Sequence, residues 1–130
     1  MYALDSNSII YLFKGQGRVS EHFLRTPPRE MAIPAITLHE LETGIAKSSS
    51  PDKRRAQLDD LVSLLRVLPF GAAEARASAR IRAALESRGT TIGPLDILIA
   101  GTALSSGATL VTHNTGELGR VQGLSVVDWF

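Results

Sequence analysis

The sequence predicts an α/β protein in three layers, in which a central parallel sheet lies between two layers of helices. Short apolar segments alternate along the chain with longer helical segments, which is typical of a parallel sheet covered on both faces. The 130 residues suit one domain, residues 1–130. Hydrophobic residues form 44% of the chain and charged residues 21%, a balance that indicates an ordinary globular protein.

The first half of the chain contains two predicted strands and three predicted helices. We expect a strand over Tyr2–Leu4 and a helix over Ser6–Phe13, in which the apolar residues recur on one face. A second strand, Met31–Ile33, follows a turn made by two prolines, and the helix Thr37–Lys47 again has one apolar face. The next helix, Pro51–Leu65, begins with proline, and the preceding serine is its expected N-cap.

The second half adds three predicted strands, two long helices and a short helical turn. The segment Ala72–Arg88 is rich in alanine, arginine and glutamate, which are strong helix formers, and a glycine follows it. Pro94–Ser106 is another helix, which Gly107 closes. The remaining expected elements are the strands Val67–Phe70, Thr109–Val111 and Leu124–Val127, and a short turn or helix over Thr115–Arg120.

Charge and composition restrict the possible functions. The formal net charge of +1 is too close to neutral to indicate nucleic-acid binding by itself, so any RNA contact requires a local basic patch. The chain has no cysteine, which excludes disulfides and thiolate metal sites; a reducing compartment is compatible with this, and we expect a cytoplasmic protein. We expect neither a signal peptide nor a membrane span, since the apolar runs are short and interrupted by polar residues.

Isolated acidic residues in apolar segments indicate the functional site. Asp5 and Asp96 are each the only charged residue of a long apolar stretch, and Glu40 shares its stretch only with Glu42. A buried carboxylate must pair, accept hydrogen bonds or bind a cation, and these stretches contain no Lys or Arg. Asp5, Glu40 and Glu117 follow strands, whose carboxyl ends meet at one edge of a parallel sheet. We therefore expect these acids, joined by Asp96, to converge there.

Several carboxylates in one pocket raise each other's pKa, and a bound divalent cation removes this conflict. Ligation by carboxylates alone favours Mg²⁺ or Mn²⁺ over zinc. Such ions commonly meet substrate phosphate, where a metal-activated water attacks phosphorus. We expect Asp5 and Asp96 to bind the metal, with Glu40 and Glu117 as further candidates.

Each of these acids also has a structural alternative. Asp5 could cap the helix that follows it, and the spacing of Thr37 and Glu40 matches a capping box. Asp96 lies near the third helical position after a proline, where the helix dipole favours an acid. Glu117 could be an exposed helix charge.

Gly44 lies one helical turn after Glu40, although glycine inside a helix costs about 1 kcal/mol relative to alanine. Two explanations are open: space kept beside Glu40 for metal or phosphate, or close packing against another helix. Basic residues on the neighbouring segments could touch an RNA backbone or form a solvated helix face; they are Lys47, Lys53, Arg54 and Arg55.

Four segments carry a family resemblance. They are YALDSN at residues 2–7, TLHELETG at residues 37–44, GPLDILIA at residues 93–100 and LVTHNTGEL at residues 110–118. In this order and spacing they resemble the four successive motifs of PIN-domain toxins of the VapC family. The likeness spans essentially the full chain.

The resemblance implies a PIN fold and a Mg²⁺- or Mn²⁺-dependent endoribonuclease with Asp5, Glu40 and Asp96 as its principal acids. Many PIN domains have an aspartate where this chain has Asn114, and in the VapC group that this chain resembles the fourth acid corresponds to Glu117. The residues expected to orient waters, acids or phosphate by hydrogen bonds are Ser6, Asn7, Thr112 and Asn114.

The resemblance also implies partners. They are a VapB-type antitoxin that covers the site, a second copy of the chain in a homodimer, and operator DNA bound only through the antitoxin. The expected substrate is structured RNA such as tRNA. One alternative is a catalytically silent PIN-fold module that acts through an antitoxin. Another is a phosphotransfer receiver, which would need a phosphoacceptor Asp after the middle strand and a Lys near the last strand, and neither is visible.

Overall fold

A five-stranded parallel sheet forms the centre of the protein. The computed structural model describes all residues, 1–130. The strand order is β3-β2-β1-β4-β5, and every neighbouring pair is parallel. The strands are β1 (Tyr2–Leu4), β2 (Met31–Pro34), β3 (Arg66–Leu68), β4 (Thr109–Val111) and β5 (Val126–Val127).

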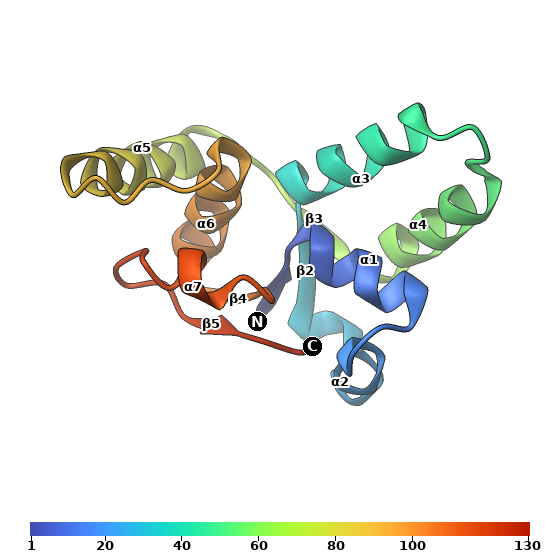
Figure 1. Ribbon diagram of the computed structural model, residues 1–130. Coiled ribbons are helices and arrows are strands. Elements are labelled where there is room, and N and C mark those ends of the chain that lie inside the picture. Colours follow the sequence, from blue (N-terminus) through green and yellow to red (C-terminus); the bar gives the residue numbers. More distant parts are fainter.

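Helices cover both faces of this sheet, as Figure 1 shows. On one side lie α1 (Ser6–Lys14), α2 (Val19–Arg25), α3 (Ala35–Lys47) and α4 (Asp52–Leu64). On the other side lie α5 (Ala72–Ser87), α6 (Pro94–Ser106) and α7 (Thr115–Leu118). A single 3-10 turn, Pro28–Glu30, leads into β2. The predicted three-layer α/β/α architecture is confirmed.

The short strands alternate between the two faces because successive side chains of a strand point in opposite directions. In β2, Met31 and Ile33 join the hydrophobic cluster beneath α1, α3 and α4, whereas Ala32 joins the cluster beneath α5 and α6. In β1, Leu4 and Ala3 divide in the same way. Both faces of the central strands β1, β2 and β4 are therefore largely buried, which is why these strands contain almost no polar residue.

One helix was not predicted. The segment Val19–Arg25 forms α2, and its only fully buried residue is Val19. Arg18 precedes it without any side-chain capping bond, so neither a cap nor an apolar stripe announces it in the sequence. The predicted helix Ser6–Phe13 is confirmed and extends to Lys14, and the chain reverses at Gly15, whose φ is 66°.

Helix α3 begins at Ala35 rather than at Thr37. Pro34 has an extended ψ of 142° and ends the strand, so the helix starts immediately after it. The structural alternative for Glu40, a capping box with Thr37, is therefore wrong. The Thr37 hydroxyl instead donates to the carbonyl of Leu4 at a distance of 3.0 Å, which ties α3 to the end of β1.

Other boundaries move by a few residues. Helix α4 begins at Asp52, with Pro51 in the capping position and no side-chain cap bond, so the predicted serine cap is wrong. Strand β3 is shifted towards the N-terminus relative to the prediction, and β5 is shorter. Gly107 ends α6 in the left-handed conformation, as expected. None of the helices combines the length and the apolar composition that crossing a membrane requires.

The strand order positions the functional site. The chain proceeds from β1 outward to β2 and β3, then returns to place β4 on the other side of β1. In open α/β sheets, ligands bind outside the carboxyl ends of the strands at such a reversal. The residues that follow β1 and β4 therefore face each other across this crevice.

Candidate active site

Asp5 follows β1 and is the most buried of the predicted acids, with 8% of its surface exposed. Its Oδ1 accepts a hydrogen bond of 2.9 Å from the backbone N–H of Ser8, so it does cap α1. Burial nevertheless raises the pKa of Asp5, because the hydrogen bonds from Thr112 and Ser8 offset only part of the desolvation. Capping therefore leaves the negative charge of Asp5 incompletely compensated.

The pKa of Asp96 is affected by the other acids of the site. It is the third residue of α6, after Pro94, as predicted. Burial raises the pKa of Asp96, and the negative charges of Glu40, Asp5 and Glu117 raise it further. The other three predicted acids therefore lie close enough to Asp96 for their charges to affect it, although the four are far apart in the sequence.

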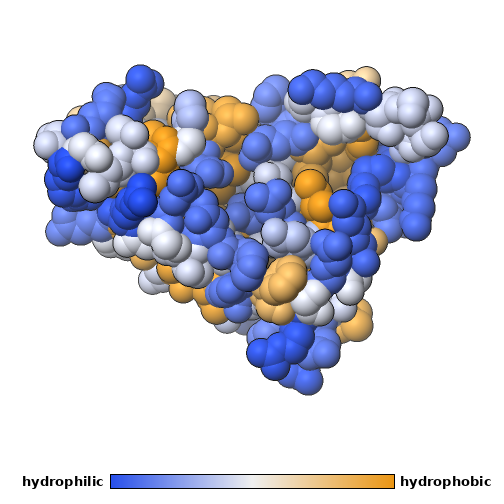
Figure 2. All heavy atoms as spheres, in the orientation of Figure 1, coloured by the Kyte–Doolittle hydropathy of each residue, from blue (hydrophilic) through white to orange (hydrophobic).

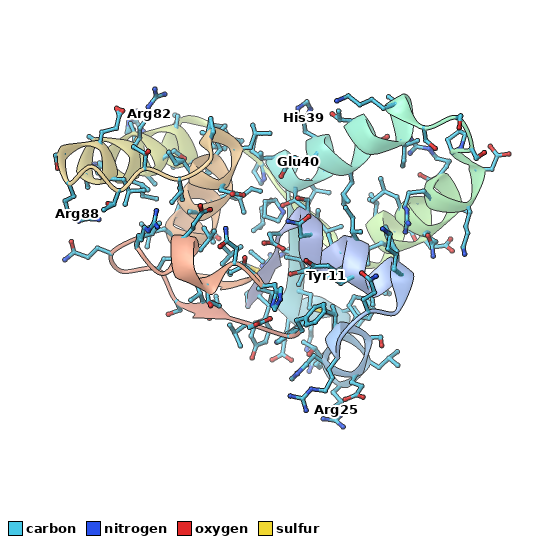
Figure 3. The ribbon with its side chains drawn as sticks, viewed as in Figure 1. Tyr11, Arg25, His39, Glu40, Arg82 and Arg88 are labelled. Atoms are coloured by element: carbon cyan, nitrogen blue, oxygen red, sulfur yellow. The ribbon has the colours of Figure 1, made fainter.

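Glu40 points from α3 toward α1 and the sheet. Figure 3 shows it on the side of α3 opposite to His39. The hydroxyl of Ser6, at the start of α1, donates a hydrogen bond of 3.0 Å to Glu40 Oε1. Because Ser6 directly follows Asp5, this bond holds the carboxylate of Glu40 beside the end of β1.

Glu117 lies on α7 and is held by Asn114. The side-chain amide of Asn114 donates to Glu117 Oε2 over 2.7 Å, and its backbone N–H donates to Thr112 Oγ1 over 3.1 Å. Asn114 thus acts here as a donor to an acid. Among the four hydrogen-bonding residues predicted, Ser6, Thr112 and Asn114 contact site acids, whereas the side chain of Asn7 is exposed and makes no hydrogen bond within the chain.

Two positioning residues were missed from the sequence. Besides its N–H bond to Asp5, Ser8 donates its hydroxyl to the carbonyl of Val111 over 3.2 Å, which fixes the start of α1 against the end of β4. Gly93 precedes α6, and a Cβ there would lie 3.3 Å from Asp96 Oδ2. In the sequence, Ser8 could have been found because it lies three residues after Asp5, a possible helix cap. Gly93 could not, because only its place before Pro94 distinguishes it.

The donor set suits a hard divalent cation. None of the four acids takes part in a salt bridge, so no Lys or Arg neutralises them. No three His, Asp or Glu side chains converge closely enough to ligate one ion through protein atoms alone. Mg²⁺ fits such an open arrangement, because it typically takes one or two carboxylates and completes its shell with waters and substrate phosphate.

Comparison with known proteins places this site in a family. The PIN domain model matches residues 2–124. The chain is 38% identical to the tRNA(fMet)-specific endonuclease VapC of Shigella flexneri, over 98% of this chain and 97% of that protein. It also resembles two solved structures, each covering 99% of this chain and 98% of theirs with a TM-score of 0.92. One is DNA-bound VapBC from Salmonella typhimurium, at 37% identity. The other is VapBC2 from Rickettsia felis bound to a promoter fragment, at 31% identity. This chain belongs to the PIN-domain family and, within it, to the VapC proteins.

Proposed function

We propose that this protein is a Mg²⁺- or Mn²⁺-dependent endoribonuclease and the toxin of a toxin–antitoxin pair. The observation that carries the proposal is that four acids, Asp5, Glu40, Asp96 and Glu117, lie near one another at the site and none of them has a Lys or Arg partner. Uncompensated carboxylates at the carboxyl edge of a parallel sheet are costly unless a cation neutralises them. The ribonuclease names of its relatives support RNA as the substrate.

The side chains of the site have different proposed roles in phosphodiester hydrolysis. When bound, the ion supplies an activated water and neutralises negative charge on phosphate. Asp5 and Asp96 are the proposed metal-holding groups, since burial raises the pKa of both and no cation in the chain compensates them. Ser6 orients Glu40 and Asn114 orients Glu117, so both outer carboxylates are fixed for accepting hydrogen bonds from waters near the reacting phosphate.

Structured RNA is the proposed substrate class, with tRNA as the first candidate, since two relatives carry the name tRNA(fMet)-specific endonuclease. The proposed partner is a small VapB-type antitoxin, because the similar structures are VapBC complexes, two of them bound to DNA. We further propose that the protein forms a homodimer, contacts operator DNA only through the antitoxin and works in the cytoplasm.

Cleavage of purified tRNA tests the function. Wild type should cleave in the presence of Mg²⁺ or Mn²⁺ and stop when EDTA is added. Asp96→Asn should lower the rate at least about a hundredfold, the scale of losing a group that acts in the reaction. The matched control is Asp60→Asn, on the exposed surface of α4, which should cleave like wild type. Equal cleavage by Asp96→Asn and wild type, or cleavage that persists in EDTA, would contradict the proposal.

A further inference from the structure

A hollow lies beside Glu40, between α1, α3 and α4. Its volume is about 350 Å³, which is in the range of pockets that bind small ligands. Figure 2 shows exposed hydrophobic surface in this region of the molecule, bordered by hydrophilic residues. The apolar floor of the hollow consists of Ile10, Leu41 and Ile45, and its basic rim consists of Lys14, Lys53 and Arg54.

The three basic side chains of the rim have no acidic partner. Lys14, Lys53 and Arg54 take part in no salt bridge. Their neighbour Arg55 differs, since it is bound by Glu42 and Asp59. Glu42 and Asp59 are thus paired with Arg55, while Glu40, in the wall of the hollow, forms no ion pair with the rim. The rim therefore keeps its positive charge for a ligand from outside the chain.

Arg54 is held in place without being neutralised. Its guanidinium donates to Gln57 Oε1 over 2.9 Å and lies 5.1 Å from the centre of the Phe13 ring. Gln57 is itself anchored, because its amide donates to the carbonyl of Phe13 over 3.3 Å. A guanidinium fixed in this way loses less conformational entropy when it binds an anion.

Gly44 keeps the hollow open. A Cβ at this position would meet no atom within 4 Å, so the explanation of Gly44 by close helix packing is wrong. Gly44 lies in the wall of the hollow, one turn from Glu40. The space that the missing side chain leaves therefore lies beside Glu40, which the hollow shares with the active site.

We propose that this hollow is an RNA subsite, in which the basic rim binds a backbone phosphate next to the cleaved one and the apolar floor receives an unstacked base. The proposal rests on the proposed function, because it needs a polyanionic chain that continues from the acids. Glu40 belongs to both the site and the wall of the hollow, so one strand can occupy both. Bases in RNA loops can be splayed out in this way.

RNA fits the hollow better than a protein segment does. Three unpaired cations around a small apolar floor match one nucleotide, whose negative charge and flat apolar face lie close together. The basic residues predicted to touch RNA are then divided by the structure: Lys53 and Arg54 belong to the subsite, Arg55 is neutralised, and Lys47 does not line the hollow.

The first experiment measures RNA affinity by fluorescence anisotropy with a labelled anticodon stem-loop, in EDTA and in the Asp96→Asn background. The test variant combines Lys14→Gln, Lys53→Gln and Arg54→Gln. The control removes the same charge from exposed arginines elsewhere, by Arg25→Gln, Arg29→Gln and Arg76→Gln. We expect the test variant to bind at least about tenfold more weakly and to lower the salt-dependence slope by roughly 0.7, the value for one lost phosphate contact on a single strand. The control should change neither by a comparable amount.

The second experiment fills the hollow without changing charge. Gly44→Leu places a side chain in open space and removes a helical glycine, so the melting temperature should stay equal or rise. RNA affinity should fall about tenfold or more, by loss of the space for a base. The control is Ala46→Leu, on the same helix, exposed and outside the hollow, which should bind RNA normally.

Several results would overturn the subsite. Equal weakening by the two triple variants would show a non-specific charge effect. Unchanged RNA affinity in Gly44→Leu would place the base elsewhere. Unchanged RNA affinity combined with lost binding of the antitoxin would make the hollow a protein-docking surface. In each of these cases metal-dependent cleavage by wild type would survive, whereas a wild type that neither binds nor cleaves RNA would refute both proposals.

Discussion

Asp5 is both a helix cap and a buried charge, so two substitutions at this position should differ in thermal stability. Asp5→Ala removes both the negative charge and the acceptor for the Ser8 N–H. Asp5→Asn removes only the charge, since asparagine caps helices about as well as aspartate. Burial raises the pKa of Asp5, so its ionised form destabilises the folded, metal-free protein at neutral pH. We expect Asp5→Asn to be more stable, without metal, than both wild type and Asp5→Ala.

The size of the loss in Asp5→Ala follows from the cap. Removing a capping side chain costs about 1 kcal/mol, and up to about 2 kcal/mol where the freed N–H is buried. For 130 residues the entropy of unfolding is roughly 0.27 kcal/mol per kelvin, at about 2.1 cal/mol per kelvin per residue. The melting temperature of Asp5→Ala should therefore lie about 4–7 °C below that of Asp5→Asn, since both variants lack the charge and only Asp5→Ala lacks the cap.

Thermal unfolding followed by circular dichroism, in EDTA at neutral pH and at a series of lower pH values, measures both effects. The stability gained in Asp5→Asn should shrink as the pH falls through the raised pKa of Asp5 toward its ordinary value of 3.8, because wild type then becomes neutral as well. Both variants should lose RNA cleavage. A drop in melting temperature for Asp5→Asn equal to that of Asp5→Ala would refute the argument that the charge is uncompensated.

Three further predictions concern packing, protons and positioning. Gly101→Ala should lower the free energy of unfolding, measured by chemical denaturation, by about 1–3 kcal/mol. The reason is that the new Cβ would lie 2.9 Å from the backbone nitrogen of Ser78 on α5. An unchanged denaturation midpoint would contradict the packing of α5 against α6. Mn²⁺ affinity in calorimetric titrations should fall as the pH falls through the raised pKa of Asp96, since protons compete with the ion for that carboxylate. An affinity that is independent of pH down to 3.8 would exclude Asp96 as a ligand. Glu117→Gln should reduce RNA cleavage more than Asn114→Ala, because Asn114 acts through Glu117, and the reverse order would make Asn114 the direct participant.

The fold could be predicted because the periodicity of apolar residues is set by burial. Strands β1 and β4 are dry on both faces, so they appear in the sequence as short apolar runs. Helix α2 could not be predicted, because its contact with the core is limited and no capping residue marks its start. The start of α3 was misplaced because Thr37 looks like a cap in the sequence, whereas its hydroxyl bonds a carbonyl of the neighbouring strand.

The acids of the site were predictable for a different reason. Asp5 and Asp96 are charged residues in apolar surroundings, and such surroundings require a compensating contact. The hydrogen bonds that orient the acids were harder to predict from the sequence. The bond from Ser6 to Glu40, for example, joins residues that are 34 positions apart. Arg54 and Arg55 are neighbours in the sequence, yet only Arg55 pairs with Glu42, and no local pattern in the sequence predicts that difference.

Anomalous diffraction from crystals soaked in Mn²⁺ tests the metal site most directly. We expect one strong peak at the carboxyl edge of the sheet, with Asp5 and Asp96 as protein ligands and Glu40 and Glu117 in contact with its waters or with the ion. The same peak should be absent from crystals of Asp96→Asn. A peak elsewhere on the molecule, or none at this edge while the wild-type crystals diffract equally well, would contradict the assignment of these four acids to a metal-dependent nuclease site.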